Sequence, residues 1–192
     1  MQVISSMLRL KARSEKEEKI SEVFKDIENK ILSMALAHQK LYESKDLSHL
    51  NLKDYFDSLL SIYKKSYSEL MNQITIQADM KDMNVLIDTA TPLGLVFNEL
   101  ISNITKYAFP GKTRGKIKIG LHLNSKKEIV LRISDNGTGL PKGFDFKKDI
   151  HLGLETVIDL IEYQLGGKIH FKSRNGLHCR IVIKEDRYKP RV

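Results

Sequence analysis

A change of hydrophobic period near residue 72 constrains the fold more than any other feature of this sequence. No glycine or proline occurs before residue 72, and the apolar positions there recur in alternating steps of four and three. From residue 74 onward, apolar and polar residues alternate over short runs that are separated by proline and glycine. The first period is typical of paired helices and the second of strands. The sequence therefore predicts a helical N-terminal part followed by a part that contains a sheet.

The N-terminal part is predicted to contain helices at about 2–13, 15–43 and 52–71. The clearest apolar seam lies in the second of these, at Ile20, Phe24, Ile27, Ile31, Met34, His38 and Leu41. A lone helical hairpin buries such a seam poorly, so residues 1–50 are predicted to be part of a dimerisation hairpin. Two copies would then form a four-helix bundle. An intramolecular helical bundle is the alternative.

Residues 51–192 are predicted to form a second domain with an α+β fold. Pro92 opens a strongly helical stretch that runs to Ala108, and a second helix is expected at about 153–165. The expected strands lie at about 74–78, 84–88, 116–123, 128–134, 168–173 and 177–183. This order of strands and helices predicts one mixed sheet with a layer of helices packed against it, which is an α/β sandwich.

Composition excludes several classes of protein. The chain has 192 residues, with 32 Lys+Arg, 24 Asp+Glu and the single cysteine Cys179. One cysteine excludes a disulfide-stapled secreted scaffold, and no apolar run reaches the roughly 18 residues needed to span a bilayer. We therefore expect a cytoplasmic domain, and a membrane anchor elsewhere in the full-length protein is compatible with that expectation.

The formal net charge of +8 raises the question of a nucleic-acid partner. The lysines and arginines are scattered over separate stretches, and no aromatic residue lies within a basic cluster to stack on bases. We therefore expect no nucleic-acid partner. The charge fits a solvated surface, an anionic small ligand or an acidic partner surface better.

Polar residues on the predicted helix that ends at Ala108 form the first candidate site. Glu99, Asn103, Lys106 and Tyr107 stand at i, i+4, i+7 and i+8, which places them on one face of an α-helix. An amide oxygen suits Mg²⁺, an ammonium suits phosphate, and a carboxylate can accept a proton. The stripe is equally compatible with a solvent-facing surface when this helix is considered alone.

Two glycine-containing motifs follow. Asp135, Gly137 and Gly139 come directly after a predicted strand, where a carboxylate can accept a hydrogen bond from an amine and glycines let the backbone approach a ligand. Gly153 and Leu154 open the next predicted helix, whose free backbone N–H groups suit phosphate. Each motif is weak alone, because turns also favour Asp, Asn and Gly.

In this order the motifs resemble those of the GHKL family of ATP-binding domains, and in particular the sensor histidine kinases. One subgroup carries A-L-x-H-x-x-L-Y on the second helix of its dimerisation hairpin, and residues 35–42 of this chain match that pattern. The stretch Lys106-Tyr107-Ala108-Phe109-Pro110 is similar to the subgroup's version of the helix end. The similarity covers about residues 2–184.

The resemblance implies a role for each motif. Asn103 would coordinate the Mg²⁺ that bridges the phosphates of ATP, and Glu99 would be the acid of the conserved Asn-containing helix, as a proton acceptor or orienting group. Lys106 would contact phosphate and Tyr107 would flank the nucleotide. The implied activity is transfer of the ATP γ-phosphoryl group to a histidine.

The remaining implied contacts lie in the second half of the chain. Asp135 would accept a hydrogen bond from the adenine amine, while Gly137 and Gly139 would leave room for the base. Residues 140–152 would form a lid over ATP, and Gly153 with Leu154 would present amides to the phosphates. The implied partners are a response regulator protein, a second copy of the chain and an upstream sensor domain.

Two departures from the family pattern matter. Family members carry the phosphoacceptor histidine in a stretch like H-R-x-K-N-N, which would precede Met1. The resemblance therefore implies that this chain is a fragment or, alternatively, a natural short form, and that it does not autophosphorylate. His38 is expected to be a packed seam residue rather than the acceptor. The second departure is Leu177, where a threonine is common, and this bears on a contact near the nucleotide.

Two rival functions remain open from the sequence. One is a GHKL regulatory serine kinase of the anti-sigma type, although such proteins lack the hairpin motif of residues 35–42. The other is a non-catalytic ATP-binding dimerisation module. His122, His170 and His178 alternate within predicted strands without metal-ligand spacing, and Cys179 is expected to be a small buried hydrophobe.

Overall fold

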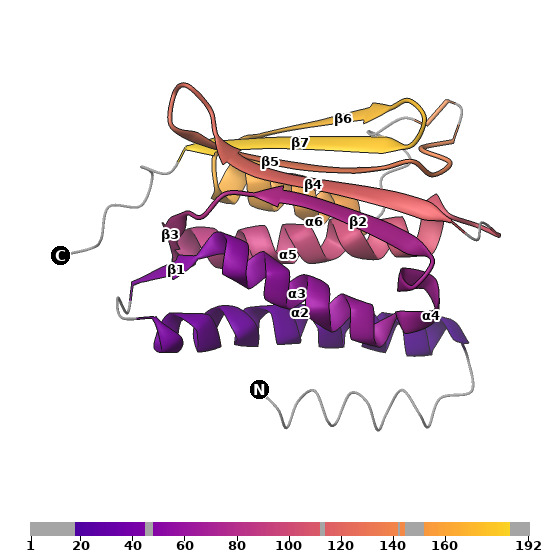
Figure 1. Ribbon diagram of the computed structural model, residues 1–192, viewed down its shortest axis with the longest axis horizontal. Helices are drawn as coiled ribbons and strands as arrows, with labels where there is room; N and C mark the ends of the chain where they lie inside the picture. The colour runs from indigo at the N-terminus through magenta and orange to yellow at the C-terminus, as the bar shows by residue number, and fades with distance from the viewer. Residues whose placement is uncertain (1–17, 45–47, 112–113, 142, 145–151, 185–192) are drawn as a thin grey trace.

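The structure is a computed structural model that describes residues 18–44, 48–111, 114–141, 143–144 and 152–184 (Figure 1). The helices and strands are α2 (Glu18–Glu43), β1 (His49–Asn51), α3 (Leu52–Ser66), α4 (Ser68–Met71), β2 (Ile74–Met80), β3 (Asn84–Leu86), α5 (Ile87–Asn103), the π-helix η1 (Ile104–Ala108), β4 (Gly115–Leu123), β5 (Glu128–Asp135), α6 (Leu152–Asp159), the π-helix η2 (Leu160–Gln164), β6 (Lys168–Ser173) and β7 (Leu177–Lys184). None of these helices combines the length and the apolar character that a membrane crossing requires.

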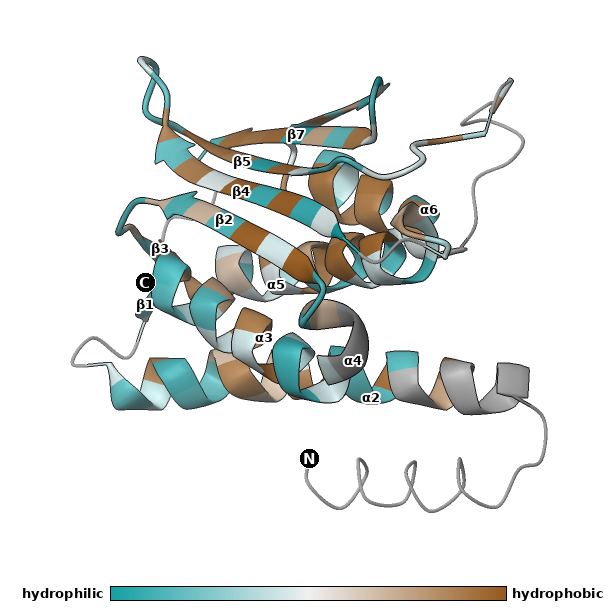
Figure 2. Ribbon diagram, turned by 45° about the vertical axis from the view of Figure 1, so that its right-hand side comes forward, coloured by the Kyte–Doolittle hydropathy of each residue, from teal (hydrophilic) through white to brown (hydrophobic). Residues whose placement is uncertain are grey.

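One five-stranded sheet organises the fold, in the order β2-β4-β5-β7-β6. β2 pairs with β4 in parallel, and the other neighbours are antiparallel. The described helices lie on one side of the sheet, with α5 and α6 against it and α2 farthest from it (Figure 1). Along β4, hydrophobic residues that face the helices alternate with hydrophilic ones (Figure 2). The predicted α+β fold with one mixed sheet is confirmed.

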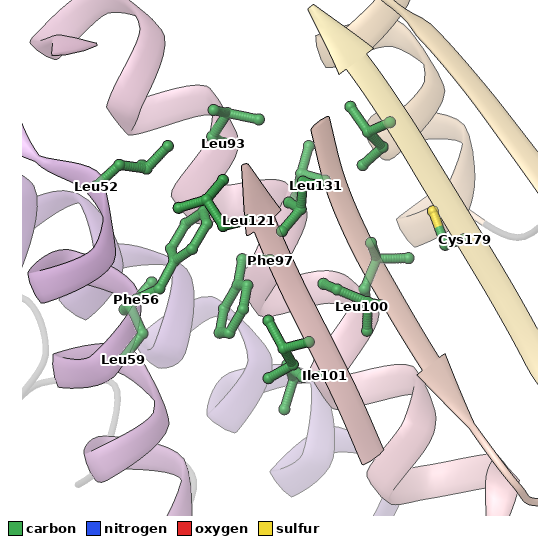
Figure 3. Packing of buried hydrophobic residues seen from close by; sticks show 14 of the residues in the cluster. Leu52, Phe56, Leu59, Leu93, Phe97, Leu100, Ile101, Leu121, Leu131 and Cys179 are labelled. Atoms are coloured by element: carbon green, nitrogen blue, oxygen red, sulfur yellow. The ribbon is translucent and has the colours of Figure 1, made fainter. Parts of the chain in front are cut away.

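The core lies between the sheet, α5 and α3. Phe56 of α3 and Phe97 of α5 are fully buried, with stacked rings whose centroids are 4.4 Å apart. Leu121 of β4 and Leu131 of β5 approach the same layer from the sheet (Figure 3). Burying one such side chain contributes about 1.5–3 kcal/mol, so this layer fixes α5 firmly on the sheet.

The structure corrects three predicted boundaries. The predicted strand at 84–88 ends at Leu86, and α5 begins at Ile87, so Pro92 lies inside the helix rather than at its start. Asp88 in the first turn favours this earlier start because it complements the helix dipole. The predicted helix at 52–71 is interrupted at Tyr67, between α3 and α4. β1, in a stretch expected to be a polar connection, pairs with β3 to form a small second sheet.

Helix α2 packs on the rest of the chain through a polar face. Asn29, Ser33 and Ala37 are buried, whereas Val23 and Ile27 are 57% and 39% exposed. The Tyr55 hydroxyl of α3 donates to the Ser33 carbonyl and also contacts the Ser33 hydroxyl, both at 3.0 Å. Most of the predicted apolar seam is therefore only partly covered by the described residues. The predicted dimer stays a prediction, and the helix expected at 2–13 lies outside the described residues.

Candidate functional site

The candidate stripe on α5 continues into a π-helix. Asn103 is the last residue of α5, and Lys106 and Tyr107 belong to η1. A π-turn adds a residue to the turn, which rotates later side chains relative to an α-helix. The Glu99 side chain is therefore nearly buried while Tyr107 is 65% exposed. The prediction that the α-helix runs to Ala108 is wrong, and the assumption that all four side chains share one face fails at Tyr107.

Glu99 lies between two helices. Its Oε1 is 2.7 Å from the Lys30 ammonium of α2. Its Oε2 faces the start of α6, because a Cβ added at Gly153 would lie 2.6 Å from that oxygen. Two predicted site residues that are far apart in sequence, Glu99 and Gly153, therefore lie against each other. Only glycine at position 153 leaves the carboxylate where it is.

Lys106 is also engaged by α2. Its ammonium donates to the carboxylate of Asp26 at 2.5 Å. Burial alone would lower the pKa of Lys106, but the hydrogen bond and charge of Asp26 outweigh burial and raise it. The lysine is therefore held charged, as a phosphate contact requires, but its partner in this structure is a carboxylate.

The contribution of α2 is the part of the site that the sequence reasoning missed. Asp26, Asn29, Lys30, Ser33 and Ala37 follow helical spacing and form one face, and the exposed Val23 and Ile27 lie beside it. The spacing of these polar residues could have indicated a docking face on α2, but the prediction followed the apolar seam on the neighbouring face. Asn29 is 7% exposed, and its Nδ2 has no hydrogen-bond partner among the described residues.

Asp135 is positioned by the end of β5 and by the neighbouring hairpin. It is 5% exposed, and its Oδ1 accepts the Gly137 N–H at 2.7 Å while its Oδ2 accepts the Leu177 N–H at 3.3 Å. Gly176, at φ +113°, lies so close to the Asp135 backbone that a Cβ there would be 2.1 Å from its carbonyl oxygen. The backbone of Leu177, rather than its side chain, therefore helps to orient this carboxylate.

The loop after Asp135 is joined to the end of the η1 helix. The Thr138 N–H donates to the Ala108 carbonyl at 2.9 Å, and its hydroxyl donates to the Tyr107 carbonyl at 3.2 Å. A Cβ at Gly137 would lie 2.1 Å from the Ala108 carbonyl oxygen, so the close approach requires glycine. The first two predicted motifs are thereby brought together.

The other predicted positions are partly described. Gly139 has φ +70°, and the Leu140 N–H beside it donates to the Ser173 hydroxyl at 2.9 Å. Leu154 is half-buried on α6. Most of the predicted lid, including His151, lies outside the described residues. His38 is exposed on α2 and Cys179 is 4% exposed, which confirms the expectation of a buried cysteine.

ATP with Mg²⁺ is the cofactor that the resemblance implies, and the residues present fit it. Mg²⁺ prefers oxygen ligands, and Asn103 offers an amide oxygen one turn from the Glu99 carboxylate. Each oxygen of Asp135 accepts one backbone N–H and keeps a lone pair for an amine. Among the described residues, no three His, Cys, Asp or Glu side chains gather to hold a metal ion.

Comparisons with known proteins agree with this geometry. Residues 1–67 match the family model described as "Histidine kinase", and residues 88–187 match that of the "Histidine kinase-, DNA gyrase B-, and HSP90-like ATPase". The second match contains all nine predicted site residues. The first contains the residues of α2 that pair with Glu99 and Lys106.

Individual relatives carry the same assignment in their names. The sensor histidine kinase PdtaS of Mycobacterium tuberculosis is 29% identical over 96% of this chain, and that of Mycolicibacterium smegmatis is 32% identical over 88%. The chain spans only 36% and 34% of these relatives. The histidine kinase domain of the Erythrobacter litoralis EL346 blue-light activated kinase has the same fold, with a TM-score of 0.76, 17% identity and 96% of each chain covered.

The motif order, the mixed sheet and both family matches therefore agree, and the predicted resemblance is confirmed. The chain belongs to the histidine kinase-, DNA gyrase B- and HSP90-like ATPase family, and within it to the histidine kinases.

Proposed function

We propose that this chain binds ATP with Mg²⁺ and transfers the γ-phosphoryl group to a histidine that lies outside it. The observation that carries the proposal is the convergence of three separate motifs. Glu99 lies against Gly153, and the loop that follows Asp135 is hydrogen-bonded to the end of the helix that carries Asn103 and Lys106. Family membership supports the reaction class.

Each of these side chains would bind a different part of Mg²⁺-ATP. Asp135, fixed by two backbone N–H groups, would accept a hydrogen bond from the adenine amine, and Gly137 and Gly139 leave space beside it. Asn103 would hold Mg²⁺, and Lys106 would pair with phosphate in place of Asp26. The bound nucleotide supplies the phosphoryl group that is transferred.

Glu99 would act on the acceptor side of the reaction. Its carboxylate is nearly buried, with one oxygen on Lys30 and the other against the start of α6. There it would orient the acceptor histidine or accept its proton, while Gly153 and Leu154 present backbone amides to phosphate. Catalysis would then rest mainly on positioning and on charge stabilisation by Mg²⁺ and Lys106.

We further infer a division into a dimerisation hairpin at residues 1–50 and a catalytic domain at 51–192, with Tyr107 flanking the nucleotide. The proposed partners are a second copy of the chain, a response regulator and an upstream sensor domain, and the proposed location is the cytoplasm. The half-exposed apolar seam of α2 supports a helical partner for this helix.

A binding measurement tests the nucleotide site. Titration of a fluorescent ATP analogue with Mg²⁺ should give saturable binding, and Asp135→Asn should weaken it about tenfold or more, because a hydrogen bond to a charged group is worth roughly 1.5–3 kcal/mol. Asp79→Asn is the matched control, since the Asp79 side chain is 85% exposed on β2. Unchanged affinity in Asp135→Asn would remove the adenine assignment.

A transfer measurement tests the reaction. The full chain is incubated with radiolabelled ATP and a separate helix fragment that carries an H-R-x-K-N-N stretch. Acid-labile label on the fragment is the expected result. Acid-stable label on serine would instead support the regulatory serine kinase, and saturable ATP binding without transfer would support a non-catalytic module.

A further inference from the structure

The face of the five-stranded sheet that points away from the helices is strongly basic. No described helix or strand covers this face (Figure 1). Alternation along β4, β5, β6 and β7 places these cations on it: Lys116, Lys118, Arg132, Lys168, Lys172, Arg180 and Lys184. We call this set the basic sheet face. On the described strands, this face carries two acidic side chains. Asp79 lies on the edge strand β2, and Glu128 is the first residue of β5.

The cations of the basic sheet face are unpaired. None of them has an ion-pair partner within the described part of the chain. Lys30, Lys53 and Lys106, which lie elsewhere, do contact carboxylates. A face on which cations outnumber acidic side chains this strongly repels itself, so its excess positive charge attracts ions or an anionic partner.

One end of this face is hollowed into a groove of about 570 Å³. A cross-strand row crosses it, in which Lys118, Ser134, His178 and Lys172 are neighbours on successive strands. Arg174 adds a further cation from the β6–β7 turn. The row spans three strand spacings, or roughly 14 Å, so an occupant meets positive charge at both ends and hydrogen-bonding groups between them.

We propose that this groove binds an acidic segment of a partner protein. The groove is lined by lysine, arginine, histidine, serine, asparagine and Asp135, and its lining contains no Phe, Tyr or Trp side chain to serve as a stacking platform for nucleic-acid bases. The described large apolar side chains that are exposed all lie off the basic sheet face, so no apolar anchor for a bilayer is present there.

This surface shares only Asp135 with the proposed nucleotide site, among the residues that the structure describes. Of the predicted site residues only Asp135 lines the groove, while Glu99, Asn103 and Lys106 lie among the helices on the other side of the sheet. The inference therefore does not depend on phosphoryl transfer. Substitution of Lys118 and Lys172 should leave nucleotide affinity unchanged, whereas Asp135→Asn should lower it.

The test compares two variants of equal charge. Lys118→Glu with Lys172→Glu removes both ends of the row, and Lys64→Glu with Lys65→Glu changes two exposed lysines of α3. Each substitution lowers the charge by two, so both variants go from +8 to +4. The probes are a fluorescent Glu/Asp peptide of about twelve residues, an oligothymidylate of equal net charge and phosphatidylserine vesicles, at about 150 mM salt, where charges are screened beyond about 8 Å.

The expected result is peptide binding that falls roughly tenfold or more in the Lys118/Lys172 variant and less than about twofold in the Lys64/Lys65 variant. Thermal unfolding of each variant checks that the fold is retained, and the milder pair Lys118→Gln and Lys172→Gln should give an intermediate loss. An equal loss of peptide affinity in both Glu variants would show that net charge alone attracts the peptide, and it would overturn the proposal of a binding site in the groove. If the oligothymidylate or the vesicles bind more tightly than the peptide, and this binding is lost in the Lys118/Lys172 variant, the groove does not select an acidic protein segment.

Discussion

The Lys30 ammonium of α2 lies 2.7 Å from the Glu99 carboxylate of α5, and four residues earlier on α2 Asp26 pairs with Lys106. The two helices therefore run antiparallel at this contact, with opposite charges crossed between them. Both side chains that the proposed reaction needs as free groups are engaged by one helix. Under the proposed function, nucleotide binding and the docking of α2 would compete for the same charges.

The first prediction concerns this competition. Asp26→Asn should increase ATP affinity roughly threefold to tenfold, because the Asp26 carboxylate occupies Lys106 and would repel phosphate. The effect is limited because the Asp26 side chain is 33% exposed and partly screened by solvent. Titration with a fluorescent ATP analogue measures it. Asp57→Asn, which breaks an exposed pair with Lys53, is the control and should change nothing. Weaker ATP binding in Asp26→Asn would contradict the competition.

The second prediction concerns the contact between Glu99 and Gly153. Gly153→Ala should reduce phosphoryl transfer by about tenfold to a hundredfold, because the new Cβ would lie 2.6 Å from Glu99 Oε2 and displace the carboxylate. Alanine favours helix by up to about 1 kcal/mol relative to glycine, so stability should not fall through the backbone.

The transfer assay with the helix fragment measures this loss, and thermal unfolding verifies the fold. Gly120→Ala is the matched control: its Cβ would make only an ordinary contact, 3.8 Å from Arg132 Cβ. Full transfer in Gly153→Ala would show that the position of Glu99 does not matter to the reaction.

The third prediction concerns the attachment of α2 to α3. Tyr55→Phe should lower the free energy of unfolding by about 1–2 kcal/mol, because it removes the buried hydroxyl that both donates to the Ser33 carbonyl and contacts the Ser33 hydroxyl. Ser33→Ala should cost less, since the carbonyl keeps its donor. Urea denaturation of both variants measures the difference. An equal or larger loss in Ser33→Ala would place the stabilisation in the Ser33 hydroxyl instead.

Most of the sheet and its helices could be predicted from the sequence because their burial follows local periodicity. β4 and β7 alternate clearly, and the helical spacing from Leu93 onward is strong, although the turn of α5 before Pro92 is predicted as part of a strand. The π-turn after Asn103 could not be predicted, because one extra residue in a turn leaves the apolar pattern almost unchanged. The three-residue strand β1 is too short to show a period at all.

The candidate site shows the same limit. Local sequence motifs predicted Glu99, Asp135 and Gly153 as site residues. In the structure Glu99 lies against Gly153, and Asp135 accepts a hydrogen bond from Gly137. Glu99 and Lys106 meet Lys30 and Asp26 only because one particular face of α2 packs on α5. A sequence pattern predicts the packed face of a helix from its apolar residues. Here the docked face is polar, with Asn29 and Ser33 buried, so the pattern favoured the wrong face for this contact.

The last prediction concerns alkaline pH. Burial raises the pKa of Cys179 from 9.0 to about 12, and burial, offset in part by the hydrogen bond to Ser33, raises the pKa of Tyr55 from 10.0 to about 12. In the unfolded chain these groups lose their protons at the lower values. The folded state therefore holds more protons above pH 9, and stability falls as the pH rises. This contribution is complete below about pH 9 and is lost by about pH 12.

Cysteine titrates first, so it makes the larger contribution from about pH 9 to 10, with a smaller one from Tyr55. The free energy of unfolding should fall there with a slope that approaches 1.4 kcal/mol per pH unit, and Cys179→Ala should flatten that slope while costing some stability at neutral pH through the lost packing. Urea denaturation at pH 8, 9 and 10 measures both effects. Val182→Ala, half-buried on the same strand, controls for lost packing and should keep the slope. An unchanged slope in Cys179→Ala would mean that the thiol is not the group that resists ionisation.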